Sequence, residues 1–521
     1  MSTPNDTAPV ACTSHAAPGA STDVPRPPPL STHEALARVL AAALPLCAQP
    51  EAIEQVPTLD ALNRVLAADI RSALDVPPAD ISAMDGYAVR AADVVAGRPM
   101  RVSQRIPAGH PAAGVLEAGT AARIFTGAPL PAGADTVVMQ EQARVQSDTV
   151  VFDAAPPAGD WINRRGSDIG KDAVILPAGT RLTPQALGLA ASVGCAVLPV
   201  ARRPRVAIFF TGDELTMPGE PLREGAIYNS SRFTLGSLLA ALGCDVTDLG
   251  IVPDRFDATR DALRRAALEH DLILTSGGVS VGDEDHVRAA VQAEGTLDRW
   301  QIAMKPGKPL AFGTVRRALG GESHDADTGT ARDTAFFIGL PGNPVSSFVT
   351  FVLFVRPFIL RLAGAARVEP QALRMRADFT QKKADRRNEF LRARINDGGG
   401  LDLFPNQSSA VLTSTVWGDG LIDNPPGHPI QAGETVRFLP FSALLAVREA
   451  VGTAAETVDV PDGVATLGDV RTWLRSRGGA WADALADTRA LRMACDHVMT
   501  GPSTQLTDGC EVAFFPPVTG G

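Results

Sequence analysis

The chain has 521 residues, far more than a single hydrophobic core can organise, so we expect roughly three to five domains. The formal net charge of −10 argues against a nucleic-acid-binding protein, because no basic surplus is available to neutralise phosphates. No apolar run is long and uninterrupted enough to span a bilayer, so we expect no membrane association. The six cysteines form no CxxC pair and no metal-ligand spacing, which is typical of free thiols in a cytoplasmic protein.

The first 32 residues are rich in Pro, Ala, Ser and Thr and lack an apolar core, which predicts a disordered extension. They contain neither the apolar segment of a secretory signal nor the arginines of a transit peptide. A helix is expected to begin near Ser31 or Thr32, with Glu34 in its first turn.

Between Ile81 and Val200 the pattern is one of short β segments separated by Gly and Pro turns. Two strings in this module are unusual. "SAMDGYAVR" places Asp85 before a glycine, and "IFTGAPLPAGAD" places Thr126 in a stiff loop. A carboxylate and a hydroxyl on rigid loops would suit the ligand-facing edge of a lid domain, although either could simply cap local backbone.

After Pro204 strands alternate with helices, beginning with "RVAIFFT", "SRFTLGSLLAAL" and "DVTDLGIV". This alternation predicts right-handed crossovers and a parallel, doubly wound α/β sheet. A polar, Gly-rich insertion follows at residues 316–333, and an apolar helix then runs to Gly364. Short β segments return from Val368 to Phe441, and the last eighty residues form a separate unit.

Polar residues and glycines gather where the strands of the α/β domain end. Ligands bind at this edge of an open α/β sheet, and a Gly-Gly turn lets backbone N–H groups approach an oxyanion. Acids beside such a cradle make sense if Mg²⁺ bridges them to a phosphate or another oxyanion. The alternative for each loop is a turn that caps a helix. The candidates are Thr211, Gly212, Glu214, Asp254, Ser276, Gly277, Gly278, Ser280 and Asp285.

Two further turns complete the predicted anion pocket. "MKPGKPLAFG" presents Lys305 and Lys308 in a stretch too apolar to need solubilising lysines. "GLPGNPVSS" opens directly onto a helix, and we interpret it as a wall of the pocket, with a plain turn as the alternative. Its candidate residues are Pro341, Gly342, Asn343 and Pro344.

Together these motifs resemble the molybdopterin molybdenumtransferase family, which includes the gephyrin E-domain, in order from about residue 33 to 440. The resemblance implies an L-shaped homodimer with each active site between the α/β domain of one subunit and the lid of the other. It implies that molybdate is inserted into adenylylated molybdopterin with release of AMP and assistance from Mg²⁺. Residues at matching positions are Asp85, Thr126, Glu214, Asp254, Asp285, Lys305, Pro341 and Pro344. Ile81 and Gln301 depart from the pattern, where Asn and Lys are usual.

The chain ends in "LTDGCEVAFFPPVTGG", which resembles the sulfur-carrier subunit of molybdopterin synthase, a ubiquitin-like β-grasp protein. The resemblance implies that Gly521 is adenylated and converted to a thiocarboxylate. The implied partners are an adenylating, sulfur-transferring enzyme and the large subunit of molybdopterin synthase. Bare glycines suit this role, because a Cβ would obstruct passage of the tail into a narrow active site.

We therefore predict a multidomain protein of α/β plus β class, with a doubly wound α/β molybdopterin-binding domain, a β-rich lid, a small β-barrel-like domain and a C-terminal β-grasp. The predicted divisions are an extension (1–32), a linking helical and β domain (33–70 and 146–200), the lid (71–145), the α/β domain (201–365), the small β domain (366–440) and the carrier (441–521).

Two other functions remain open on the sequence. One is another enzyme on the same α/β domain, such as a molybdopterin adenylyltransferase or a nucleotide amidohydrolase. The β-rich module with Asp85 and Thr126 argues against both, since neither enzyme needs it. The other is a non-catalytic scaffold with the β-grasp as an interaction module.

Overall fold

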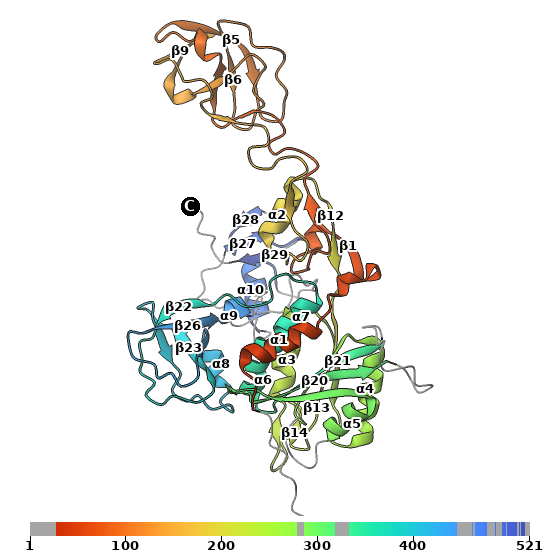
Figure 1. Cartoon of the computed structure of the whole chain (residues 1–521). Helices are drawn as coiled ribbons and strands as arrows, with labels where there is room; N and C mark the ends of the chain where they lie inside the picture. Colours follow the sequence, from red (N-terminus) through yellow and green to blue (C-terminus); the bar gives the residue numbers. More distant parts are fainter. Residues whose placement is uncertain are drawn as a thin grey trace, which may run out of the picture.

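The computed structural model describes residues 28–278, 286–317 and 333–444, together with 461, 464–476, 485, 492–495, 498–507, 510 and 512–515. Most of the predicted N-terminal extension lies outside these residues. Figure 1 shows an elongated molecule in which one β sheet stands apart from the other domains.

The linking domain begins with α1 (Thr32–Ala42), whose first turn has a capping box. The Ser31 side chain accepts from the backbone N–H of Glu34, and the Glu34 carboxylate accepts from the backbone N–H of Ser31. These bonds hold the pKa of Glu34 below its ordinary value. The helix therefore begins where the sequence predicts it.

The rest of the linking domain is built from segments on both sides of the lid. β1 (Ile53–Pro57) pairs with β12 (Val197–Ala201), and β2 (Ile70–Arg71) pairs with β11 (Val174–Leu176), both antiparallel. Together with α2 (Pro184–Ser192) they enclose a shared core that includes Leu66, Leu182 and Leu198. Short 3-10 turns accompany them at Leu46–Ala48, Pro50–Ala52 and Thr58–Asp60.

The lid is a six-stranded sheet with the order β7-β4-β6-β5-β9-β8. Its strands are β4 (Gly86–Val89), β5 (Pro99–Ile106), β6 (Thr120–Ile124), β7 (Thr136–Met139), β8 (Ala143–Gln146) and β9 (Thr149–Phe152). The sheet thus continues past residue 145, where the sequence placed the boundary, because the β8–β9 hairpin returns the chain to pair with β5. β3 (Ile81–Ser82) and β10 (Ile162–Asn163) pair at its base.

The α/β domain contains a six-stranded sheet with the order β16-β13-β17-β21-β20-β18. Its strands are β13 (Arg205–Phe210), β16 (Asp245–Ile251), β17 (Leu272–Ser276), β18 (Gly295–Gln301), β20 (Pro309–Arg316) and β21 (Thr334–Leu340). The pairings among β13, β16, β17 and β21 are parallel, as the sequence predicts, whereas β20 pairs antiparallel with both β18 and β21. Residues 302–308, which connect β18 to β20, form no helix, so the chain reverses its direction there.

Helices cover both faces of this sheet, so its strands are apolar on both sides. Along β13, Val206, Ile208 and Phe210 face a core shared with α3 (Ser230–Ala241) and the helix after β21. Ala207 and Phe209 face α4 (Phe256–Glu269) and α5 (His286–Glu294) on the other side. The alternation explains why "RVAIFF" carries no polar position after its first residue.

The helix that follows β21, here called the central helix, is buried in the same hydrophobic core as one face of the sheet. It runs as α6 (Pro344–Thr350), a π-helical turn (Phe351–Val355) and α7 (Arg356–Leu362). The stretch Pro344–Leu362 is long and apolar enough to cross a membrane, but 89% of its most apolar window is buried inside the protein. Its length and composition exceed what the sequence analysis indicated, and burial against the sheet accounts for its hydrophobicity.

The small β domain forms a sheet with the order β19-β23-β25-β26-β22, and β24 pairs with β23. Its strands are β19 (Met304–Lys305), β22 (Leu373–Arg376), β23 (Asn388–Ile395), β24 (Leu401–Leu403), β25 (Gly420–Asn424) and β26 (Thr435–Pro440). Two short helices, α8 (Thr413–Trp417) and α9 (Phe441–Leu444), belong to it. Because β19 comes from the turn between β18 and β20, this turn joins the α/β domain to the small β domain.

The C-terminal region has its own small core. α10 (Leu467–Ser476) packs Val470 and Leu474 against Leu485. β27 (Arg492–Cys495) pairs with β28 (Val498–Thr500) and β29 (Val512–Phe515). The helix begins directly after Thr466, and the three strands form one antiparallel sheet.

Candidate active site

A cavity of about 690 Å³ lies at the carboxyl ends of β13, β16, β17 and β21. β13 is followed along the chain by β16 on one side and then by β17 on the other, so the sheet reverses its strand order here. Such a switch point is where open α/β sheets bind ligands. The predicted residues that line the cavity are Thr211, Gly212, Glu214, Asp254, Gly277, Gly278, Lys305, Lys308, Pro341, Gly342 and Asn343.

One end of the cavity is acidic. Gly212 has φ +146°, which other residues rarely adopt, and a Cβ built on it would lie 2.5 Å from a carboxylate oxygen of Glu214. Asp254 approaches from the loop after β16, and its Oδ1 is buried without a hydrogen-bond partner among the described residues. A buried carboxylate oxygen without a partner is costly, which makes it a candidate cation ligand.

Glycines at the ends of β17 and β21 form the floor of the cavity. Gly277 has φ +100°, and a Cβ there would lie 2.7 Å from the backbone oxygen of Thr211. A Cβ on Gly342 would meet nothing closer than the Cα of Gly277, at 3.9 Å. The two strand ends therefore meet through bare backbone, which a ligand can approach closely.

Ser276 is not part of this floor. Its side-chain oxygen lies 3.0 Å from both the backbone oxygen of Pro341 and the side-chain oxygen of Ser347, and the residue is buried. Alternation along β17 turns it away from the cavity and into the contact with the central helix. Pro344, the first residue of α6, also lies outside the lining and begins the helix instead.

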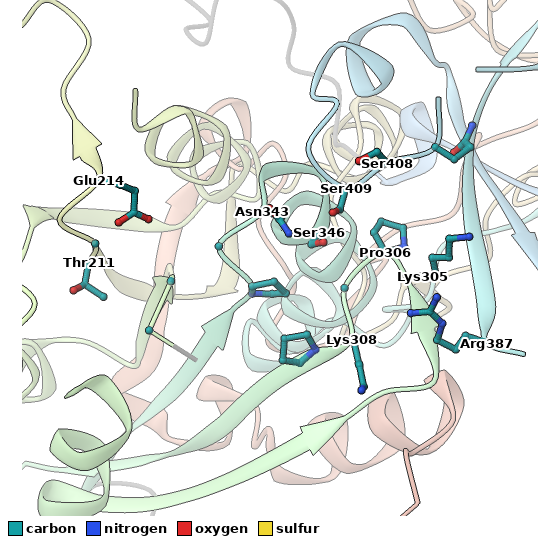
Figure 2. A pocket seen from close by; sticks show the side chains of 18 of the residues that line it. Thr211, Glu214, Lys305, Pro306, Lys308, Asn343, Ser346, Arg387, Ser408 and Ser409 are labelled. Carbon is teal, nitrogen blue, oxygen red and sulfur yellow. The ribbon is translucent and has the colours of Figure 1, made fainter. Parts of the chain in front are cut away.

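The opposite end of the cavity carries cations. Figure 2 shows Glu214 and Thr211 on one side, and Lys305 and Arg387 on the other. Lys305 Nζ lies 3.0 Å from Glu389 Oε1 and 3.4 Å from Asp385 Oδ2. The Arg387 guanidinium bonds to Asp385 and holds the pKa of that carboxyl well below its usual range. Both cations are thus already paired within the protein.

Lys308 differs from these two. It is exposed on the rim of the cavity, and no acidic side chain among the described residues lies within ion-pair distance of it. Its ammonium is therefore the cation in this wall that can meet an anionic ligand without first breaking an ion pair.

Sequence reasoning missed the wall that the small β domain and the central helix supply. The residues are Ser346, Arg387, Gln407, Ser408 and Ser409. Gln407 is held by hydrogen bonds with the backbone of Arg392, which fixes the loop that carries the two serines. The polar string "NQSS", between two strands of the small β domain, was the available signal.

Asp85 and Thr126 lie together on the lid but do not line the cavity. Thr126 donates to Asp85 Oδ1 from its backbone N–H and from its hydroxyl, both at 2.8 Å. These bonds lower the pKa of Asp85, with a smaller effect from the charge of Arg123. Figure 1 shows the lid sheet well separated from the α/β sheet of the same chain. The predicted Ser280, Asp285 and Gly521 lie outside the described residues.

Comparison with known proteins accounts for this arrangement. Residues 30–194 match the MoeA N-terminal region (domain I and II), 207–361 a probable molybdopterin binding domain, and 372–441 the MoeA C-terminal region (domain IV). The molybdopterin molybdenumtransferase of Haemophilus influenzae is 39% identical over 404 residues, which cover 76% of this chain and 96% of that protein. The chain belongs to the molybdopterin molybdenumtransferase family. The Nostoc sp. member is 35% identical over 389 residues, covering 72% of this chain and 86% of that protein.

The solved structures agree with this membership. The molybdopterin biosynthesis moeA protein from Pyrococcus horikoshii OT3 has a TM-score of 0.66 at 27% identity, covering 79% of this chain and 100% of that one. The matches to molybdopterin molybdenumtransferases therefore span nearly the whole of those proteins. Residues 446–521 lie beyond the other family regions and match the ThiS family. The chain thus joins a molybdopterin molybdenumtransferase to a ThiS-family domain, as the sequence predicts.

Proposed function

We propose that this protein inserts molybdate into adenylylated molybdopterin and releases AMP, and that the cavity is the site of this reaction. The observation that carries the proposal is the polarity of the cavity, which has carboxylates at one end and cations and hydroxyls at the other. A substrate that carries a diphosphate and reacts with an oxyanion needs both kinds of group along its length. Family membership supports the same reaction.

The acidic end has the donor set for Mg²⁺. Glu214 and Asp254 supply two carboxylates, and Asp254 Oδ1 has no other partner in the described part of the chain. No group of three or more potential ligands clusters among the described residues, so the remaining ligands would be substrate phosphates and water. When bound, the cation would offset the negative charge of the diphosphate.

The rest of the cavity binds and orients the two substrates. The bare backbone at Gly277 and Gly342 can lie against the diphosphate of adenylylated molybdopterin. Lys308, with the hydroxyls of Ser408 and Ser409, can receive molybdate at the opposite end. Arg387 and Lys305 stay paired with Asp385, so they form part of the cavity wall but add little net positive charge to it.

The site needs a second copy of the chain, and we infer that the protein is a homodimer. The lining contains no lid residue among those described. On the lid, two hydrogen bonds from Thr126 hold the Asp85 carboxylate in place. Large apolar side chains stand exposed on the α/β domain between residues 222 and 233, including Ile227 and Phe233. An exposed apolar patch of this kind suits a protein interface.

We further propose that the C-terminal domain carries sulfur as a Gly521 thiocarboxylate for dithiolene synthesis. The ThiS-family match over residues 446–521 and the small core around α10 support a folded carrier. Its partners would be an adenylating, sulfur-transferring enzyme and the large subunit of molybdopterin synthase, all in the cytoplasm. One chain would then serve two steps of cofactor synthesis.

Molybdate-dependent AMP release tests the first proposal. Full-length protein is mixed with adenylylated molybdopterin and Mg²⁺, and AMP is measured with and without molybdate. We expect AMP release to require molybdate and to fall about a hundredfold in Glu214→Gln, because the variant loses a ligand of the cation that offsets the diphosphate charge. An adenylyltransferase would instead consume ATP and molybdopterin, and a scaffold would do neither. AMP release that ignores molybdate would refute insertion.

Intact mass tests the carrier. The protein is incubated with ATP, an adenylating partner and a sulfur donor, and its mass is compared with that of a chain lacking Gly521. A gain that matches replacement of one oxygen by sulfur, lost in the truncated chain, supports the carrier. A full-length chain that gains no mass in this incubation refutes it.

A further inference from the structure

The edge of the lid that bears Asp85 and Thr126 also carries two arginines and a phenylalanine. Strand register places Arg105 of β5 opposite Arg123 of β6, and Arg123 opposite Tyr87 of β4. The Cζ atoms of Arg105 and Arg123 lie 5.0 Å and 4.7 Å from the centre of the Phe125 ring. Phe125 directly precedes Thr126, so the two guanidinium groups and the Asp85–Thr126 pair belong to the same edge.

Arg123 is committed to the lid itself. Its guanidinium donates to the backbone oxygen of Gly86 at 3.0 Å and to Gln140 Oε1 at 2.7 Å, and it also lies over the Tyr87 ring at 5.2 Å. Its charge acts on Asp85 and helps to lower the pKa of that carboxyl. Arg123 therefore fixes the edge and offsets the nearby acid.

Arg105 differs from Arg123 in the interactions of its guanidinium. It is exposed, and no hydrogen bond or ion pair of its guanidinium occurs among the described residues. Two other exposed lid arginines are paired, Arg101 with Glu117 and Arg144 with Asp153. A guanidinium that rests on an aromatic ring loses freedom while its N–H donors stay available, so less entropy is lost when it binds an anion.

We propose that Arg105, positioned by Phe125, is a substrate-binding residue that contacts the diphosphate of adenylylated molybdopterin. The inference rests on the proposed function, because the ligand sits in the cavity of a second copy whose site this lid edge completes. The planar guanidinium can donate two parallel hydrogen bonds to phosphate oxygens, which a lysine cannot reproduce. The cavity itself offers few unpaired cations for this purpose, since Lys305 and Arg387 are bound to acids.

Binding of ADP, which has the adenosine and diphosphate of the substrate, tests the inference in the full-length protein. We expect Arg105→Gln to weaken ADP binding about tenfold in titration calorimetry, the effect of one charge-assisted contact. Arg105→Lys should recover only part of the affinity, and Phe125→Leu should weaken binding by removing the support of the guanidinium. Arg144→Gln, which removes an exposed lid arginine paired with Asp153, is the matched control and should bind ADP like the wild type.

Steady-state kinetics provide a second readout that a purely structural role would not move. The KM for adenylylated molybdopterin should rise about tenfold in Arg105→Gln, while kcat at saturation and the thermal unfolding midpoint stay near their wild-type values. Wild-type KM and ADP affinity in Arg105→Gln would overturn the role of Arg105 and leave the proposed function standing. If the wild type releases no AMP with molybdate, the proposed function fails and this inference with it.

Discussion

Mixed dimers should show that each active site is built from two chains. Asp85 belongs to the lid, and Glu214 belongs to a cavity that contains no lid residue of its own chain among those described. We expect Asp85→Asn and Glu214→Gln homodimers to be almost inactive. A dimer with one chain of each kind has one site with both residues intact and one with neither, so it should show about half of the wild-type rate.

The reverse combination is the control. When one chain carries both substitutions and its partner is wild type, each site formed between chains contains one defect, and the dimer should be inactive. Chains with two different affinity tags allow both dimers to be purified and assayed for molybdate-dependent AMP release. If the doubly substituted combination keeps half of the activity and the complementary one has none, the site lies within one chain and our reasoning is refuted.

Three other predictions follow from the geometry of the site and the lid. Gly277→Ala should destabilise the fold by about 1–3 kcal/mol in thermal unfolding, because Gly277 has a positive φ and a Cβ there would clash with the backbone of Thr211. Gly342→Ala should keep wild-type stability and lose substrate affinity, because a Cβ there meets no protein atom closely. Equal losses of stability in the two variants would contradict this. Lys308→Gln should raise the KM for molybdate about tenfold with little change in kcat, and an unchanged KM would remove Lys308 from the site. Because hydrogen bonds lower the folded-state pKa of Asp85, its stabilisation exists above the unfolded-state pKa of about 4 and is lost as pH falls through the folded-state value. The difference in Tm between wild type and Asp85→Asn should therefore shrink from about pH 7 to about pH 3, and a constant difference would contradict the assignment.

Sequence reasoning finds the residues whose neighbourhood follows from local order. Glu214, Asp254 and Gly277 follow three strands of one sheet, and the carboxyl ends of parallel strands meet at one edge. Their proximity therefore needs only the alternation of strands and helices. The helix start at Ser31 is equally local, since its capping box is formed within four residues.

What the sequence could not supply depends on packing between distant segments. Arg387 and Ser408 reach the cavity because β19, from the turn between β18 and β20, pairs with β23 of another sheet. No periodicity encodes that pairing. The direction of β20 is also hidden, because an apolar run buried on both faces looks the same in parallel and antiparallel sheets. Whether the Ser276 side chain faces the cavity could not be predicted, because its direction depends on the residue at which the strand ends.

The chain enters and leaves the lid at neighbouring points, because β2 and β11 pair beside the base of the lid. The core of the linking domain is made from residues on both sides of the lid in the sequence. The lid has its own apolar clusters, which include Val150 and Ile124. The lid is therefore an inserted domain with its own hydrophobic core. A short turn joining β2 to β11 could replace it without opening either core, and lids could be exchanged between relatives to transplant their substrate preference onto an unchanged cavity.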